Sequence, residues 1–393
     1  HILEDFGMNY MAQRVADFGT TIFSEMTTLA NVHEAINLGQ GFPDFAAPFF
    51  VKEAAVEAIR AEINQYAPAN GRSSLREAIA EKVANFYGLI VDPNGEINVT
   101  HGATEAIFAT IMGLVDPGDE VIVFEPFYDS YLPSISMAGG IPKTYTLRPP
   151  HWEIDEAALT SLFSDKTKLI LINTPHNPTG KVFSYEELTL IANLCQKHDV
   201  IAVTDEVYEH IVFDGLTHFS LASFPGMASR TVIISSLGKT FSVTGWKVGW
   251  TIANRNLSQA IFRAHQFMTF CGAAPLQEAA VIALSSQKKY YDELTQLYTK
   301  KRNYLVDALS SAGLTPIAPS STYFVMVDIS ALDFIDDVAF CRHLTREIGV
   351  AAIPPSAFYQ NPADGAGLAR FAFCKEDKTL EEAARRLQRL KTG

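Results

Sequence analysis

The sequence is poor in cysteine, and its cysteines form no recognisable pattern. The 393 residues include four cysteines, which lie far apart with neither a CxxC pair nor zinc-ligand spacing: Cys195, Cys271, Cys341 and Cys374. A disulfide framework is not expected in a chain of this size, so we expect a reducing, cytoplasmic setting. No metal site is predicted.

Positive charge and long apolar runs are also scarce. The 31 lysines and arginines are outnumbered by 44 acidic residues, and no basic cluster occurs. Nucleic-acid binding requires a basic surface, so we do not expect it. No stretch of about 18 uncharged apolar residues occurs, and the N-terminus lacks the basic and apolar regions of a signal peptide. We therefore expect a soluble protein without a membrane span.

What the sequence does contain is a series of short, apolar, β-branched runs. Apolar residues make up 48% of the chain, enough for a large buried core. Nearly continuous apolar runs are typical of strands that are buried on both faces of a sheet. We predict seven such strands, at residues 96–100, 120–124, 143–147, 168–173, 200–204, 231–237 and 248–253.

Segments with helical spacing lie between several of these runs, and the alternation predicts a mostly parallel, doubly wound α/β sheet. The run 248–253 follows 231–237 without room for a crossover helix, so we predict that it is antiparallel. The predicted helices of this part span residues 51–63, 73–87, 103–114, 127–137, 155–163 and 184–198, with Ser73 as an N-cap.

A second, smaller α/β unit is predicted towards the C-terminus. A long helix ends before Gly313, which has the position of a C′ glycine. We predict a large domain over residues 46–297 and a small domain formed by residues 1–45 and 298–393. The further predicted elements are helices at 290–312, near 336–348 and from 377, and strands at 323–329 and 368–373.

Polar residues follow four of the predicted strands, and Lys239 is the most informative of them. The carboxyl ends of parallel strands meet at one edge, where open α/β sheets bind ligands. Loss of water and nearby cations would lower the pKa of this amine and make it nucleophilic; the alternative is a solvated loop lysine. Two other motifs fail, because a phosphate-binding P-loop needs glycine where Ile233 stands, and Ser236-x-x-Lys239 lacks the other motifs of penicillin-binding enzymes.

Asp205, at the end of the strand at 200–204, needs a partner because a buried carboxylate is costly alone. The protonated pyridine nitrogen of a cofactor would be such a partner and would make the ring an electron sink; a helix N-cap or an arginine pair are the alternatives. Tyr208 can donate to the phenolic oxygen of the ring. Asn177 lies in a turn fixed by two prolines and a glycine, and its amide binds either a ligand oxygen or its own backbone.

A phosphate bound to this acidic chain needs a local anion site. Ala103 and Thr104 open a helix directly after a strand, so their backbone N–H groups and the helix dipole can bind an anion. Ser236 and Lys247 can complete the site with a hydroxyl and an ammonium group. Tyr128 is the predicted aromatic that stacks on the cofactor ring.

Together these residues resemble the fold-type I pyridoxal 5′-phosphate (PLP) enzymes of aminotransferase class I/II. The similarity is strongest to the group of kynurenine aminotransferase, glutamine transaminase K and methionine aminotransferase, and it covers nearly the whole chain. The motifs that carry it are Asn37-Leu-Gly-Gln-Gly-Phe-Pro-Asp44, Asn64-Gln-Tyr66, Asn177-Pro-Thr-Gly-Lys181, Asp205-Glu-Val-Tyr208 and Gly238-Lys-Thr-Phe-Ser-x-Thr-Gly-Trp-Lys247.

The resemblance implies that Lys239 is the catalytic residue and carries PLP as a Schiff base. It also implies that Arg370 binds the α-carboxylate of the substrate through a bidentate fork, with Gly41 and Asn177 beside the substrate. Tyr66 would reach the phosphate of the neighbouring subunit, which implies a homodimer with shared active sites. The segment 271–275 would line the pocket of the partner.

The implied reaction transfers the amino group of an L-amino acid, of aromatic, methionine, glutamine or kynurenine type, to a 2-oxo acid. Two alternatives stay open: a PLP-dependent β-lyase of cysteine conjugates, and a ligand-sensing regulator, which the short segment before Asn37 disfavours. Pocket aromatics favour aromatic or methionine-like donors; the candidates are Phe23, Tyr131, Phe270 and Phe358.

Overall fold

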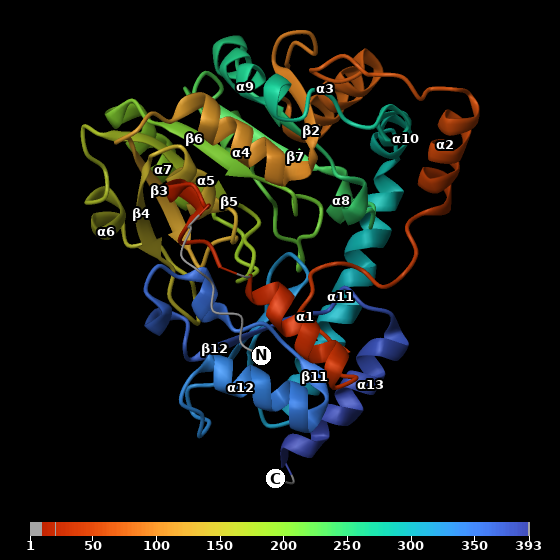
Figure 1. The fold of residues 1–393 in the computed structure, drawn as a ribbon, viewed down its shortest axis with the longest axis vertical. Helices are drawn as coiled ribbons and strands as arrows, with labels where there is room; N and C mark the ends of the chain where they lie inside the picture. The colour runs from red at the N-terminus through yellow and green to blue at the C-terminus, as the bar shows by residue number, and fades with distance from the viewer. Residues whose placement is uncertain (1–9, 20, 392–393) are drawn as a thin grey trace.

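The computed structural model describes residues 10–19 and 21–391, which fold around two main sheets (Figure 1). The larger sheet has seven strands, as predicted, and their order is β2-β8-β7-β6-β5-β3-β4. Strand β8 pairs antiparallel with both of its neighbours, and the pairs among the other strands are parallel. The strands are β2 (Ile97–His101), β3 (Glu120–Glu125), β4 (Ile141–Thr146), β5 (Thr167–Asn173), β6 (Ile201–Asp205), β7 (Thr231–Ser236) and β8 (Val248–Ile252).

Helices cover both faces of this sheet, which is why its central strands are apolar along their whole length. One face packs on α4 (Gly102–Leu114), α5 (Tyr131–Met137) and α9 (Arg255–Met268). The opposite face packs on α6 (Glu156–Thr160) and α7 (Tyr185–His198), and near β2 and β8 on α3 (Ser73–Tyr87) and α10 (Ala274–Leu284). The helix α2 (Phe49–Arg60) lies against α10.

Several boundaries differ from the sequence predictions. The helix expected at 127–137 begins at Tyr131, so Tyr128 lies in the turn before it. Ser73 is not an N-cap: the cap position is Arg72, whose amide donates to the Gln277 side chain of α10. This helix is therefore anchored at its start by a neighbouring helix rather than by its own serine. Helices α9 and α10 were not predicted.

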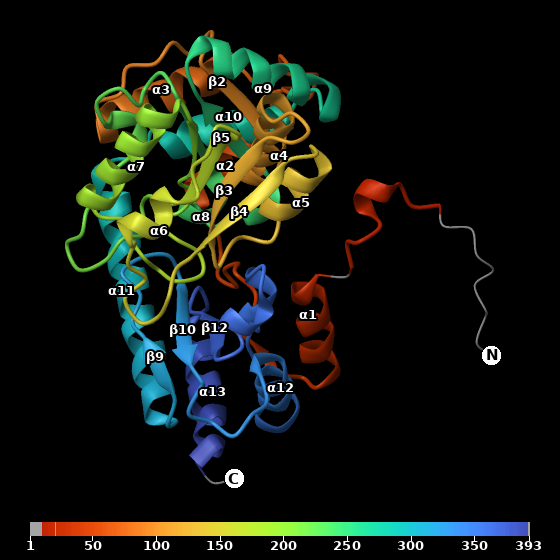
Figure 2. The ribbon, with the colours of Figure 1, turned by 90° about the vertical axis from the view of Figure 1, so that its left-hand side faces the viewer.

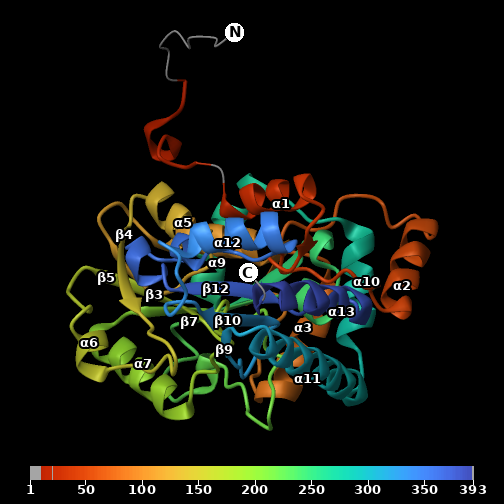
Figure 3. The same ribbon diagram turned by 90° about the horizontal axis from the view of Figure 1, so that it is seen from below.

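The smaller sheet has the order β12-β10-β9 and is antiparallel, with β9 (Thr315–Ile317), β10 (Phe324–Asp328) and β12 (Leu368–Ala372). The helices α11 (Lys288–Ser311) and α12 (Asp337–His343) lie on opposite sides of it (Figure 3). Helix α11 runs from the upper body into the lower one (Figure 1) and ends before Gly313, which has φ +87°, as expected for a C′ glycine.

The N-terminal segment packs on this smaller unit. Helix α1 (Ile22–Val32) lies beside α12 (Figure 2), and its Met26 belongs to the same core as the smaller sheet. After it, β1 (Ile36–Asn37) pairs with β11 (Val350–Ala351), and the chain ends with α13 (Asp377–Leu387). The domain limits 46–297 and 1–45 with 298–393 stay a prediction, and residues 1–9, 20 and 392–393 lie outside the described part. Within residues 10–19 and 21–391, no helix has the length and apolar character that crossing a membrane requires.

Candidate active site

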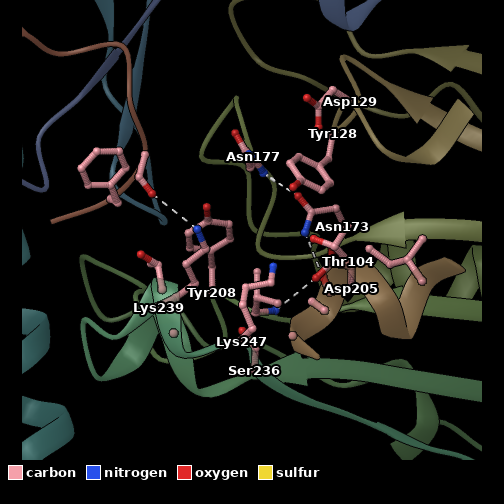
Figure 4. A pocket seen from close by; sticks show the side chains of 18 of the residues that line it. Thr104, Tyr128, Asp129, Asn173, Asn177, Asp205, Tyr208, Ser236, Lys239 and Lys247 are labelled. Atoms are coloured by element: carbon pink, nitrogen blue, oxygen red, sulfur yellow. Dashed lines mark hydrogen bonds between the residues drawn. The ribbon is translucent and has the colours of Figure 1, made fainter. Parts of the chain in front are cut away.

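A cavity of about 300 Å³ lies where the carboxyl ends of β5, β6 and β7 face the smaller sheet. Eleven of the predicted site residues line it, and Figure 4 shows many of them converging from separate elements. They are Gly41, Ala103, Thr104, Tyr128, Asn177, Asp205, Tyr208, Ser236, Lys239, Lys247 and Arg370. Phe23, expected against the substrate, lines the cavity as well.

Lys239 lies in α8 (Leu237–Thr240), the single helical turn that follows β7. Its Nζ donates to the Gly41 carbonyl at 3.4 Å and lies 5.5 Å from the ring centroid of Tyr208. Burial lowers the pKa of Lys239 to about 8, opposed by the charge of Asp205. An amine with a depressed pKa is more often uncharged, and therefore more nucleophilic, than a solvated lysine, and bond formation to an aldehyde requires this property.

Asp205 ends β6 and is buried, with its side chain facing the cavity. The Tyr131 hydroxyl donates to its Oδ2 at 2.7 Å, and the Val207 amide donates to Oδ1 at 3.4 Å. Burial raises the pKa of the Asp205 carboxyl to about 6. Among the described residues no arginine pairs with it and it caps no helix, so neither alternative partner is present. A cationic ring nitrogen in the cavity would supply the missing charge.

The N-terminus of α4 forms a cradle of backbone. Gly102 has φ +70°, and a Cβ on it would lie 3.0 Å from Cε of Lys247. A Cβ on Gly249 would lie 2.4 Å from the Gly102 carbonyl carbon, so the two segments approach as closely as glycine allows. The amides of Ala103 and Thr104 follow at the start of this thirteen-residue helix. Together with Lys247 they provide N–H donors and a cation for a phosphate.

Tyr128, Tyr208 and Asn177 surround the space between this cradle and Arg370. The ring of Tyr128 packs edge-on against Tyr131, with centroids 5.7 Å apart, and the ring of Tyr208 packs edge-on against Tyr323 at 5.3 Å. The Asn177 Oδ1 accepts from Nη1 of Arg370 at 3.1 Å, so this amide faces the cavity rather than its own turn.

Arg370 lies in the middle of β12 and is 2% exposed. Its Nη2 donates to the Gly39 carbonyl at 2.9 Å, while its buried Nε has no hydrogen-bond partner. Three aromatic rings surround its guanidinium group, with centroids 4.1 to 5.3 Å from Cζ: Phe324, Phe23 and Phe358. Burial lowers the pKa of Arg370 to about 10. A buried guanidinium without a carboxylate partner is suited to bind the carboxylate of a ligand.

Tyr66 does not line the cavity. Its side chain is 84% exposed, and its ring packs edge-on against Phe270 at 5.4 Å. Phe270 is exposed as well. Phe358 does not line the cavity; it is buried and stacks on Phe23, which does. These positions agree with a role at the surface of the chain for Tyr66 and Phe270 rather than inside its own pocket.

Three functional side chains were not predicted in the roles that the structure gives them. Tyr131 was expected as a pocket aromatic, but it binds Asp205 from the start of α5. The Tyr323 hydroxyl donates to the Gly41 carbonyl at 2.7 Å and its ring lies 5.6 Å from Lys239 Nζ. Asp129 lines the cavity next to Tyr128. No local sequence signal marks these residues, because their partners come from distant segments.

Known proteins resemble this chain along nearly its whole length. The family model "Aminotransferase class I and II" matches residues 33–387. Methionine aminotransferase of Escherichia coli is 43% identical over 96% of this chain and 97% of its own. Kynurenine–oxoglutarate transaminase of Dictyostelium discoideum is 41% identical over 97% of this chain and 96% of its own.

Solved structures show the same fold. The structure of an E. coli protein with a methionine aminotransferase function matches with a TM-score of 0.93 at 43% identity, over 96% of this chain and 99% of its own. N-Succinyldiaminopimelate aminotransferase from Mycobacterium tuberculosis matches with a TM-score of 0.94 at 42% identity, over 97% and 100%.

Proposed function

The chain belongs to the class I and II aminotransferase family and is an amino-acid aminotransferase. We propose that it uses PLP, bound through Lys239, and that it prefers amino-acid donors with uncharged side chains. The observation that carries the proposal is one cavity lined by a lysine with a depressed pKa, a buried carboxylate and a buried arginine, neither of which has an ion-pair partner among the described residues. These groups match the aldehyde, the ring nitrogen and the substrate carboxylate, respectively. When bound, PLP supplies an aldehyde for the amino group and a ring that withdraws electrons from Cα.

Each residue has a distinct task in this proposal. Arg370 binds the α-carboxylate through its guanidinium group, which Asn177 keeps in place. Asp205 keeps the ring nitrogen protonated. Lys239 would hold PLP through its aldehyde, and its free amine would move a proton at the substrate Cα. Because the site is enclosed by aromatic rings, water is kept away from Arg370, which strengthens its interaction with the carboxylate.

The charges along the cavity favour uncharged donors of the aromatic, methionine, glutamine or kynurenine type. Among the described residues that line it, the cations are Lys239, Lys247 and Arg370, and all three have tasks at the cofactor or the α-carboxylate. The carboxyl of Asp129 also lines the cavity, and when ionised it adds negative charge to the wall. A second carboxylate on the substrate would meet this charge, and the described residues that line the cavity offer no further cation to bind it.

We propose a homodimer in the cytoplasm, with Tyr66 reaching the phosphate site of the partner. The exposed ring pair of Tyr66 and Phe270 supports a subunit contact there. All four cysteines are free thiols, which suits a reducing compartment. The relatives named above are transaminases and support neither elimination from cysteine conjugates nor regulatory sensing.

The variant Lys239→Ala tests the central assignment. Purified with PLP, it should lose the visible absorption of the lysine-bound cofactor and turn over no amino acid, because the variant lacks the amine that is proposed to bond to the aldehyde. The matched control is Lys288→Ala, since this lysine is 84% exposed on α11 and should leave both properties unchanged. An active, coloured Lys239→Ala protein would refute the proposal.

The donor class is tested by single-turnover reactions with a panel of amino acids. Methionine, glutamine and aromatic amino acids should bleach the cofactor band at lower concentrations than aspartate or glutamate. Asp129→Asn should improve the reaction of the acidic donors relative to methionine, because it removes a like charge. A preference of the wild-type protein for acidic donors would contradict this part of the proposal.

A further inference from the structure

A second group of buried polar side chains lies behind the cavity, and none of them has a task in the reaction described above. We call it the Glu209 cluster; its members are Lys82, Tyr87, Glu206, Glu209, His218 and Ser235. Lys82 and Tyr87 belong to α3, Ser235 belongs to β7, and the others lie on the loop that follows β6. All except Tyr87 are buried below a tenth of their surface, and Tyr87 donates its hydroxyl into the cluster.

Glu209 is the centre of the cluster. The Lys82 Nζ lies 2.7 Å from its Oε1, and the two side chains are 3% and 4% exposed. The Ser235 hydroxyl donates to the same oxygen at 2.7 Å, and the Tyr87 hydroxyl donates to Oε2. Burial would raise the pKa of Glu209, but Lys82 and the hydroxyl donors hold it at about 2. Glu209 is therefore ionised and held from α3 and β7 at once.

Glu206 extends the cluster along the same loop. Its Oε2 lies 2.8 Å from Nε2 of His218, and its Oε1 accepts from the Thr204 hydroxyl at 2.8 Å. The neighbouring His210 lies 4.0 Å from Glu209, and burial lowers the pKa of His210 to about 3, so it is neutral. Both carboxylates of the loop thus have fixed partners: Glu209 binds side chains of α3 and β7, and Glu206 binds Thr204 of β6 and His218 of the same loop.

Stability alone does not account for such a cluster. A buried ion pair loses the hydration of both charges, and well-packed apolar residues in its place are often as stable or more stable. An ion pair with several hydrogen-bond donors also fixes positions, because each hydrogen bond restrains the backbone segments that carry its donor and its acceptor. The effect of the Glu209 cluster therefore depends on which backbone segments it restrains.

The cluster members are chain neighbours of the residues that line the cavity. Asp205 precedes Glu206, Tyr208 precedes Glu209, and Ser236 follows Ser235. Adjacent side chains along a strand point to opposite sides, so Ser236 faces the cavity while Ser235 binds Glu209. The cluster therefore holds, from behind, the segments that carry three of the proposed cofactor-binding side chains.

We infer that the Glu209 cluster is a positioning device that fixes Asp205, Tyr208 and Ser236 relative to the cofactor, with Lys82 and Glu209 as its positioning residues. The inference rests on the proposed function, because it assigns these three side chains to PLP. Binding groups lose effect when they are held loosely, and displacements of about 0.5 Å matter. Loosening the cluster should thus weaken cofactor binding and alter the ring environment without removing a group that touches PLP.

The test compares Glu209→Gln and Tyr87→Phe with wild type. Titration of the cofactor-free proteins should show the dissociation constant of PLP rising at least about tenfold in Glu209→Gln, and less in Tyr87→Phe, which removes one hydroxyl. The pH midpoint of the visible absorption of bound PLP should shift by at least about half a unit, because the charges around the ring move. A purely structural role would lower the unfolding temperature and leave both values unchanged.

The control is Asp214→Asn, which makes the same chemical change on the same loop. Asp214 accepts hydrogen bonds of 2.6 and 2.9 Å from Arg302 of α11, and its loss should alter thermal stability alone. Should Glu209→Gln fail to fold, Tyr87→Phe still decides the question. Wild-type affinity and midpoint in a folded Glu209→Gln or Tyr87→Phe protein would overturn the inference, whereas wild-type protein that fails to bind PLP would overturn the proposed function itself.

Discussion

Asp205 is buried and Lys239 is half-buried, and desolvation moves the pKa values of the two groups towards each other. Burial raises the pKa of Asp205 to about 6 and lowers that of Lys239 to about 8. The ionised form of each group therefore costs free energy in the cofactor-free fold. A ligand that places a cation beside Asp205 and bonds covalently to Lys239 removes this cost. This is a residue-scale reason to expect tight PLP binding.

The pH dependence of stability tests the position of Asp205. An aspartate titrates near 3.9 in the unfolded chain and at about 6 in the cofactor-free fold. The folded state binds more protons between these values, so stability falls as the pH rises from about 4 to 6. Without PLP, Asp205→Asn should therefore be about 1–3 kcal/mol more stable than wild type above pH 6 and show no gain below about pH 4.

Denaturant unfolding at the two pH values measures this difference. With PLP bound the sign should reverse, because the variant has no carboxylate for the ring nitrogen and binds the cofactor more weakly. A variant that is no more stable than wild type at high pH would show that the ionised Asp205 carboxylate does not lower the free energy of unfolding.

Arg370→Lys tests carboxylate binding at the same scale. Lysine keeps the positive charge but loses the planar fork, so kcat/KM should fall about 10- to 100-fold, mainly through KM. Steady-state kinetics with methionine measures the change. The matched control is Arg148→Lys, because Arg148 is 69% exposed and its replacement should have no effect; an unchanged KM in Arg370→Lys would exclude the assigned role.

At the scale of elements, the phosphate cradle depends on the close approach of α4 and β8. Gly249→Ala would place a methyl group 2.4 Å from the Gly102 backbone, so one element has to move. We expect a loss of about 1–3 kcal/mol in unfolding free energy and weaker PLP binding. Gly245→Ala is the control, because its Cβ would meet nothing within 4 Å; equal behaviour of the two variants would contradict the close approach.

Sequence patterns located the elements of the large sheet better than the helices around it. The apolar runs placed all seven strands, and the missing crossover before β8 correctly predicted its antiparallel direction. Helices α9 and α10 were not predicted, although Asn254 caps the first and Pro275 opens the second. Ser73 was wrongly taken as a cap, because the contact of Arg72 with α10 is tertiary.

At the scale of the whole molecule, the predicted shared active site can be tested by mixing subunits. Tyr66→Ala and Lys239→Ala should each be nearly inactive as homodimers. Because Tyr66 is proposed to act on the partner, a mixed dimer contains one site with both natural residues. After random exchange, half of the dimers are mixed and activity should recover to about a quarter of wild type.

Turnover before and after exchange measures the recovery, and size-exclusion chromatography confirms the dimer. Two Lys239→Ala subunits mixed with each other serve as the control. If mixing restores nothing although mixed dimers form, Tyr66 does not act across the interface.

Strand patterns were enough to bring Lys239, Asp205 and Asn177 together, because these residues follow apolar strands and the ends of parallel strands necessarily meet at one edge. The residues that support them became visible only in the folded chain. Tyr131, Tyr323 and the Glu209 cluster act through contacts between distant segments, such as the 122 positions between Tyr87 and Glu209. Local sequence patterns indicate which face of an element is buried, but they do not indicate which distant residue packs against that face.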